Sequence, residues 1–328
     1  MKKKIVIEVV ALLLTLGLLA SVSWYLGNLY MPERLDYGAT WNMYLQEPED
    51  TVELMFLGSS LAYCDIIPSV IYEQTGFTTY VVSAPYMKPD TAYFYLKEAL
   101  KTQSPGVVML EATSFFFSDQ EADYYKGNVG YMPRGLNRLG ATLSAPEAER
   151  FGLLFPLYNY HDRWTAYSPA DYFRPRPDAH PDPLAGYTAM KVHVPQNGRK
   201  IREFPATEEE LLSNLSWLEK IIALCAEEDI RLELFVVPSC EYLSEDHLAR
   251  LTDAAGEIPL TDFNAAFEEI GLDSGTDFYD SRHLSVEGAV KFSRYLAEYI
   301  CRFDLTGLPH DEELWQQRID HLKRLLES

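Results

Sequence analysis

The chain has 328 residues, of which 47% are hydrophobic, so it is long enough to form one large domain or two small ones. Its net charge is −21, and three of its 28 basic residues are the consecutive lysines 2–4. Such an acidic body argues against nucleic acid as a partner. The four cysteines form no Cys-x-x-Cys pair and no histidine lies at metal-ligand spacing, so the sequence implies neither a metal nor an organic cofactor.

The N-terminus carries a predicted membrane anchor over residues 1–30. An apolar run extends from Ile5 to about Leu26, and its uncharged part, Val9–Leu26, is long enough to span a lipid bilayer. Trp24 and Tyr25 lie at its far end, where an aromatic belt is expected. The three lysines predict a cytoplasmic N-terminus, which would leave a single-pass protein of the cell membrane with its body outside. A cleaved signal peptide is the alternative, but its apolar region would be unusually long and no Ala-x-Ala site follows.

After a connector at 31–50, predicted strands and helices alternate. The expected strands are Glu53–Leu57, Thr78–Val82, Gly106–Glu111, Arg231–Val237 and an edge strand at Leu260–Phe263. The expected helices are Ser60–Thr75 with a break at Pro68, Thr91–Thr102 capped by Asp90, Thr207–Glu227, Asp246–Ala255, Ser285–Phe303 and Asp311–Leu326. This alternation predicts a three-layer α/β/α sandwich with a mostly parallel, doubly wound sheet over residues 51–303, preceded by the transmembrane helix. The charged C-terminal helix occupies 304–328.

The periodicity lapses between about residues 115 and 205, in a stretch rich in Tyr, Pro, Arg and Gly. So long an irregular segment inside a compact domain is unusual unless it is functional. We therefore expect an insertion that covers the carboxyl ends of the strands, where ligands bind in such sheets. Within it, Asn159, His161 and Arg163 lie among aromatic residues and are candidates for binding a sugar or an acyl group. The alternative is a well-packed loop anchor.

Two segments carry the residue types needed for acyl transfer. Ser60 directly follows the first strand, at the start of a helix whose outward N–H groups carry partial positive charge. Of the seven histidines, only His283 has an aspartate, Asp280, three residues earlier, and it precedes a predicted helix. Together they supply a nucleophile, a base and a carboxylate that orients the base. Taken alone, each segment is equally compatible with a turn or a helix cap.

The order of Ser60, Asp280 and His283 resembles the SGNH (GDSL-like) hydrolase and acyltransferase superfamily. With its anchor, the chain is similar to the membrane-anchored SGNH proteins of teichoic-acid D-alanylation and polysaccharide O-acetylation. The family's first block maps onto Gly58, Ser59 and Ser60, which implies that Ser60 is the nucleophile.

Two departures concern the oxyanion hole that this resemblance implies. The second block of the family offers a glycine N–H, and here Ser83 takes that place. The third block supplies an asparagine side chain, which is missing after the strand that ends at Glu111; Thr113 or Ser114 would have to substitute. One missing donor can lower the rate ~10²–10³-fold.

The resemblance implies an extracytoplasmic serine-dependent O-acyltransferase or esterase that acts on a cell-envelope glycopolymer without a cofactor. Its expected partners are the lipid bilayer, a membrane-bound O-acyltransferase and a polysaccharide or teichoic-acid-like substrate. Two alternatives stay open: a stand-alone esterase that needs no partner, and a non-catalytic assembly factor, which the missing asparagine would favour.

Overall fold

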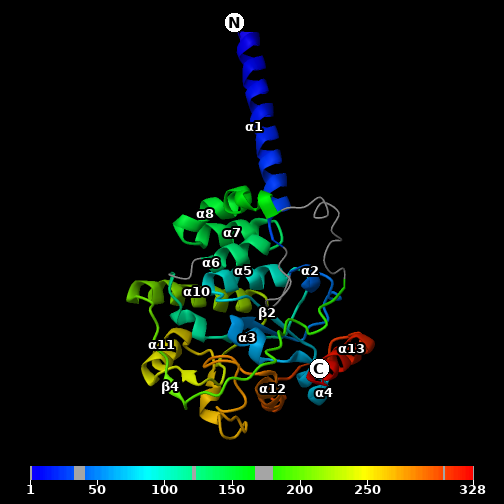
Figure 1. Ribbon diagram of the computed structural model, residues 1–328, viewed down its shortest axis with the longest axis vertical. Helices are drawn as coiled ribbons and strands as arrows, with labels where there is room; N and C mark the ends of the chain where they lie inside the picture. Colours follow the sequence, from blue (N-terminus) through cyan, green and yellow to red (C-terminus); the bar gives the residue numbers. More distant parts are fainter. Residues whose placement is uncertain (1, 33–40, 120–122, 167–179, 306, 328) are drawn as a thin grey trace.

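The structure is a computed structural model that describes residues 2–32, 41–119, 123–166, 180–305 and 307–327. It has an α/β fold built on a central five-stranded sheet, and one long helix, α1 (Lys2–Tyr30), projects from the body (Figure 1). Residues Lys3–Gly27 of α1 are long and apolar enough to cross a membrane, and most of this stretch is exposed, whereas Gly27 at its end is buried against the body.

The central sheet is entirely parallel. Its strands are β1 (Leu54–Gly58), β2 (Thr79–Ser83), β3 (Val107–Glu111), β5 (Arg231–Val236) and β7 (Leu260–Asp262), in the order β2-β1-β3-β5-β7. After β1 the chain moves outward to β2 and then returns to the other side of β1 to form β3. The order of strands therefore reverses beside β1, and the crevice at such a reversal is where open α/β sheets bind ligands.

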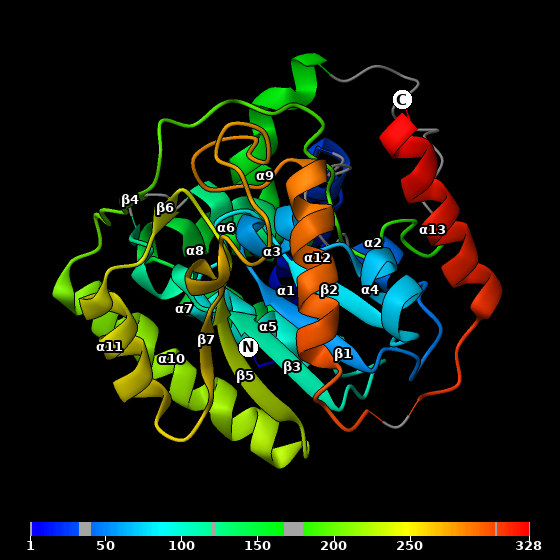
Figure 2. The same cartoon turned by 90° about the horizontal axis from the view of Figure 1, so that it is seen from below.

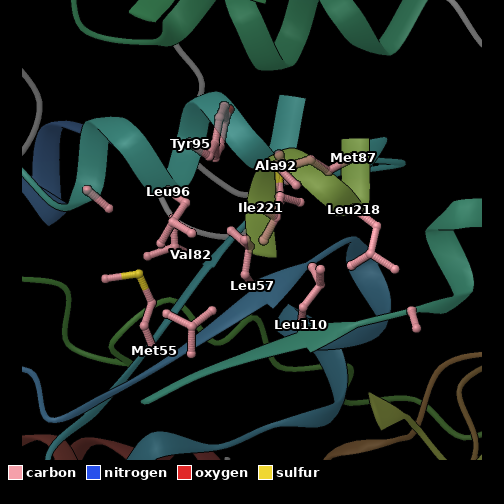
Figure 3. Packing of buried hydrophobic residues seen from close by; sticks show 14 of the residues in the cluster. Met55, Leu57, Val82, Met87, Ala92, Tyr95, Leu96, Leu110, Leu218 and Ile221 are labelled. Atoms are coloured by element: carbon pink, nitrogen blue, oxygen red, sulfur yellow. The ribbon is translucent and has the colours of Figure 1, made fainter. Parts of the chain in front are cut away.

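Alternate residues of each strand pack on opposite faces of the sheet. In β1, Met55 and Leu57 face helices α5 (Pro89–Ala99) and α10 (Glu208–Glu227), as Figure 3 shows, while Leu54 and Phe56 face the other side. That second face is covered by α3 (Ser60–Asp65), α4 (Pro68–Thr75) and α12 (Val286–Ile300), with α12 lying across the strands in Figure 2. Because both faces are buried, the central strands β1 and β3 are nearly continuous apolar runs rather than alternating ones.

The remaining elements are shorter or peripheral. They are α2 (Trp41–Tyr44), the 3₁₀ turn η1 (Thr113–Phe116), α6 (Asp123–Asn128), η3 (Val129–Tyr131), α7 (Leu136–Ser144), α8 (Glu147–Leu154), α9 (Pro156–Tyr160), η4 (His161–Ala166), α11 (Glu245–Ala255), η6 (Phe263–Ala266), α13 (Glu312–Glu327) and a two-stranded parallel sheet of β4 (Lys200–Ile201) and β6 (Glu241–Tyr242). The predicted break at Pro68 is present, because α3 ends at Asp65 and α4 begins at Pro68.

Two local expectations are wrong. Asp90 does not cap α5: Lys88 occupies that position, and Asp90 is buried in the first turn, where its carboxylate accepts a hydrogen bond from the Tyr125 hydroxyl (2.9 Å). The second half of the expected connector belongs to the body, because Trp41 and Tyr44 are buried in the core. Both differences arise from tertiary burial, which local propensity does not encode.

The segment expected to be an irregular insertion has two parts with different locations. Residues 123–166 form helices, of which α7 packs on α5 and α9 packs on α1. Residues 184–202 instead run past α3 and the loop that carries His283, to which they are joined by backbone hydrogen bonds from Thr188 to Tyr63 (2.7 Å) and from Val194 to Phe278 (2.8 Å). Of these two parts, it is the second that contacts the elements that carry Ser60 and His283.

Candidate active site

Ser60 is positioned by the junction of β1 and α3. Ser59 is the N-cap of α3, and its hydroxyl accepts a hydrogen bond from the Leu61 N–H (3.4 Å). The capping function therefore belongs to Ser59, which leaves the Ser60 hydroxyl available. Gly58 is required at this turn, since a Cβ there would lie 2.7 Å from the Cβ of Glu111. As the first residue of α3, Ser60 has a backbone N–H that needs no partner within the helix.

His283 and Asp280 lie in a tight loop just before α12. Asp280 Oδ1 accepts hydrogen bonds from the backbone N–H groups of Arg282 (2.7 Å) and His283 (2.9 Å), which fixes the carboxylate beside the imidazole. His283 Nδ1 lies 2.9 Å from Asp280 Oδ2, and its Nε2 lies 2.8 Å from Ser60 Oγ. The hydrogen bonds expected among these three residues are thus present. With a proton on Nδ1 donated to Asp280, Nε2 can accept the Ser60 proton.

The charge state of Asp280 follows from its contacts. Partial burial would raise its pKa, but the hydrogen bond and charge of His283 and the two backbone N–H donors outweigh burial and hold the pKa well below its ordinary range. Asp280 therefore stays ionised at neutral pH. An ionised carboxylate can both orient the ring and stabilise its protonated form.

A buried acid that the sequence did not single out joins the two halves of this site. Asp65, at the end of α3, is fully buried, and its Oδ1 accepts the backbone N–H of Leu284 (2.9 Å), the residue after His283. Its Oδ2 is buried without a hydrogen-bond partner, and burial raises its pKa well above the usual value. The only signal in the sequence is an aspartate within the apolar run 61–67.

A second buried acid, Glu111, ends β3 beside Gly58. Its Oε1 accepts the Thr113 N–H (3.0 Å), while its Oε2 is buried without a partner. Burial raises the pKa of Glu111 to about 7, although hydrogen bonds from the backbone and hydroxyl of Thr113 oppose that rise. Thr113 is therefore already engaged with Glu111, and the structure does not offer it as an oxyanion donor.

The other two oxyanion candidates occupy different environments. Ser83 is paired in register with Gly58 at the carboxyl end of β2, next to the strand that carries Ser60. Its hydroxyl is buried without a partner, so any contribution to the site would come from its backbone. Ser114 is buried in η1, where its carbonyl accepts the Phe117 N–H (3.1 Å), and no contact joins it to Ser60.

The three candidates in the insertion lie elsewhere. Arg163 donates a hydrogen bond to the carbonyl of Tyr30 (2.7 Å) at the end of α1, and His161 Nδ1 lies 2.9 Å from the Tyr158 carbonyl. Asn159 belongs to α9, which packs on α1 and α8. The structure therefore places Asn159, His161 and Arg163 beside α1 and does not bring them to Ser60.

Two arginines lie at the edge of the site. Arg282 directly precedes His283, and Arg202 follows β4, where its N–H bonds to Tyr242 (2.8 Å). The adjacent Glu241 donates its backbone N–H to Ser281 (2.9 Å), which brings the two segments together. Burial and the charge of Arg282 lower the pKa of Arg202 to about 10, with Glu111 acting in the opposite direction.

Glu111 and Glu241 act on Arg202 electrostatically, but neither arginine is held in a close ion pair with a described residue. Arg202 lies over the rings of Phe204 (4.6 Å) and Phe117 (5.4 Å), and no ion pair or side-chain hydrogen bond is found for Arg202 or Arg282 within the part of the chain that the structure describes. A pair of like charges whose guanidinium groups form no ion pair among the described residues can bind an anionic group.

Comparison with known proteins adds no relative: no family model matches the chain, and no curated protein matches it significantly.

Proposed function

We propose that the protein is a serine-dependent acyltransferase or esterase in which Ser60 is the nucleophile, His283 the base and Asp280 the orienting carboxylate. The observation that carries this proposal is the continuous hydrogen-bonded line from Asp280 through His283 to Ser60. It joins residues 223 positions apart at the carboxyl edge of a parallel sheet. A turn or a helix cap does not require that convergence, whereas nucleophilic catalysis does.

The chemistry follows from this geometry. Ser60 Oγ attacks an acyl carbonyl while its proton passes to His283 Nε2, and the alkoxide of the donor ester leaves with that proton as an alcohol. The acyl group remains on Ser60 as an ester. A hydroxyl of the acceptor, or water, then loses its proton to His283 and attacks the ester, which restores Ser60. The Ser60 N–H and the backbone at Ser83 are the nearest candidates to stabilise the oxyanion.

We interpret the fold as the three-layer α/β/α arrangement of the SGNH superfamily. The two cores on opposite faces of the parallel sheet support this interpretation. The positions of Gly58–Ser60 after β1, of Ser83 at the end of β2, and of Asp280 and His283 before the last helix of the sheet domain also agree with it.

The compartment and the substrate are part of the proposal. We take α1 as a membrane anchor with the N-terminus in the cytoplasm and the body outside, beside a cell-envelope polymer. A multi-span acyltransferase in the same membrane would supply the acyl group. The two neighbouring positive charges of Arg202 and Arg282, which form no ion pair in the described part of the chain, favour a polysaccharide or teichoic-acid-like acceptor that carries carboxylate or phosphate groups.

One observation favours the non-catalytic alternative. The third family block lacks its asparagine, and Thr113, the closest substitute, is engaged with Glu111. An assembly factor would keep the fold and the polar contacts without turnover. The decisive question is therefore whether Ser60 reacts.

A fluorophosphonate probe, which labels activated serines, tests this. The full-length protein in detergent should be labelled, and Ser60→Ala and His283→Ala should not. Ser59→Ala is the matched control: it removes the helix cap but keeps the nucleophile, so labelling should persist. Equal labelling of wild type and Ser60→Ala, or full polymer acylation by Ser60→Ala in cells, would contradict the proposal and favour the assembly factor.

A further inference from the structure

The helices beside α1 expose an unusual number of large apolar side chains. They belong to α7, α8, α9 and η4, which we call the apolar platform. Its exposed residues are Leu136, Leu139, Leu143, Phe151, Leu154, Phe155, Tyr158 and Trp164. Leu136 is 84% exposed and Trp164 is 64% exposed. Single exposed apolar residues are common on protein surfaces, whereas a cluster of this size is not. A patch of this kind marks an interaction surface.

Helix α7 has the reverse of the usual polarity. Its outer face carries Leu136, Leu139 and Leu143, which recur at helical spacing, whereas the buried residues are Asn137, Ala141 and Thr142. The buried Asn137 side chain donates a hydrogen bond to Glu98 Oε2 (2.8 Å), so this polar group on the inner face has a partner within the protein. A helix that buries its polar groups and exposes its leucines matches an apolar medium outside the protein.

The apolar platform is continuous with α1. Helix α9 packs on α1 so closely that a Cβ on Gly27 would lie 2.6 Å from the Leu157 nitrogen. Arg163 of η4 bonds to Tyr30 at the end of α1. Figure 1 shows α7 and α8 beside the point where α1 meets the body. A bilayer that contains α1 therefore reaches this face.

The level of the bilayer surface is marked by an aromatic contact. Trp24 lies at the body end of α1, and the guanidinium of Arg134, just before α7, lies 3.9 Å from the centre of its ring. Tryptophans of membrane spans gather at the interface between lipid and water. The beginning of α7 therefore lies at the same depth as that interface.

The charge of this region also fits a lipid surface. Residues 123–166 contain five basic residues, Lys126, Arg134, Arg138, Arg150 and Arg163, and four acidic residues, Asp123, Glu147, Glu149 and Asp162. Its net charge is thus slightly positive in a chain with a net charge of −21. Basic residues beside an apolar face are typical of helices that lie in the membrane interface.

We propose that the apolar platform lies in the headgroup and upper acyl region of the lipid leaflet around α1. This surface is separate from the Ser60 site and from the chemistry proposed for it. It requires only that α1 spans the membrane. The occupant we propose is lipid, because the platform adjoins the end of α1 and, in a bilayer that contains α1, its leucines would otherwise lie in water at the membrane surface.

The test places a fluorophore at single cysteines of the full-length chain. Cys301 is the one exposed cysteine among four and is first replaced by serine. The probe is attached to Leu143→Cys, and to the matched control Leu212→Cys on α10, since the two leucines are 56% and 57% exposed. Leu13→Cys in the middle of α1 reports whether α1 spans. The proteins are reconstituted at low density into phosphatidylcholine and phosphatidylglycerol vesicles that contain lipids with a shallow or a deep nitroxide quencher.

The expected result is that the deep quencher removes most of the emission at residue 13. The shallow quencher should remove most of the emission at residue 143, whose emission maximum should also be blue-shifted. Neither quencher should change the emission at residue 212. Equal emission at 143 and 212 would overturn the proposal. A blue shift at 143 without quenching would overturn it in favour of a second copy of the chain as the occupant. No quenching at residue 13 would remove the span on which the proposal depends.

Discussion

The Ser60 site and the apolar platform are built by the chain in opposite ways. Ser60 and His283 come from segments 223 residues apart and meet at 2.8 Å, and Asp280 completes the hydrogen-bonded line. The platform comes from consecutive helices between Leu136 and Ala166, and its outward leucines touch little of the protein. The site exists only where two distant segments of the chain meet in the fold, whereas the platform exists because one continuous segment is rich in exposed apolar residues. A change in one region should therefore leave the function of the other intact.

The largest expected effect is that of replacing Asp280, which should change the Ser60 site and leave the platform intact. Asp280→Asn keeps the shape of the loop but disfavours the His283 tautomer that accepts the Ser60 proton, so the rate of ester hydrolysis should fall ~10⁴-fold. Initial rates with p-nitrophenyl acetate measure this. Quenching of the probe at residue 143 should be unchanged, and a rate loss below about tenfold would show that His283 does not depend on Asp280.

Glu111 should affect stability as a function of pH. Its pKa is raised from 4.5 to about 7, so the folded state binds more protons than the unfolded state between these values. The free energy of unfolding then falls as pH rises through that window. Glu111→Gln keeps an acceptor for the Thr113 N–H and does not titrate. Between about pH 4 and pH 8, the free energy of unfolding of the wild type should therefore fall by about 3 kcal/mol relative to that of the variant. Denaturant unfolding in detergent, followed by tryptophan fluorescence, gives the difference; parallel curves for the two proteins would mean that Glu111 titrates normally.

Asp65 tests whether the two halves of the site must be held together. Asp65→Leu removes the acceptor of the Leu284 N–H, so His283 should shift and kcat should fall ~10²-fold while KM stays constant. Asp65→Asn keeps the acceptor and imitates the neutral acid that burial favours, and it should retain most of kcat. If both variants lost kcat equally, the charge of Asp65 rather than its hydrogen bond would matter.

The smallest expected effect is in the platform. Gly27→Val pushes a side chain against the backbone of α9 and should destabilise its packing on α1 by about 1–3 kcal/mol. Ester hydrolysis by the purified protein should not change, whereas quenching at residue 143 should weaken. Loss of hydrolysis together with quenching would break the separation between the two regions.

Much of the fold could be predicted because its signals are local. The apolar strands, the break at Pro68 and the strand-to-helix turn at Ser60 are each encoded within a few residues. The Asp280–His283 pair was identifiable from its spacing and from the helix that follows. Asp65 and Arg202 were not, because their importance arises from burial and neighbours that only the tertiary structure creates. Asn159 and Arg163 were predicted to lie near Ser60, but they lie beside α1. Glycine and proline interrupt the short helices of that segment, and the leucines of α7 point outward, so the sequence pattern did not resemble that of packed helices.

The absence of a side chain at Gly27 has a consequence for how the protein meets its substrate. Because α9 is packed directly against α1, we expect α1 and the body to turn and tilt together. Under the proposed function, Ser60 would then stay within one layer above the membrane, and polymer segments would have to diffuse into that layer to react. Selection among hydroxyl groups along a long chain would in this case depend on their height above the lipid as well as on their chemistry.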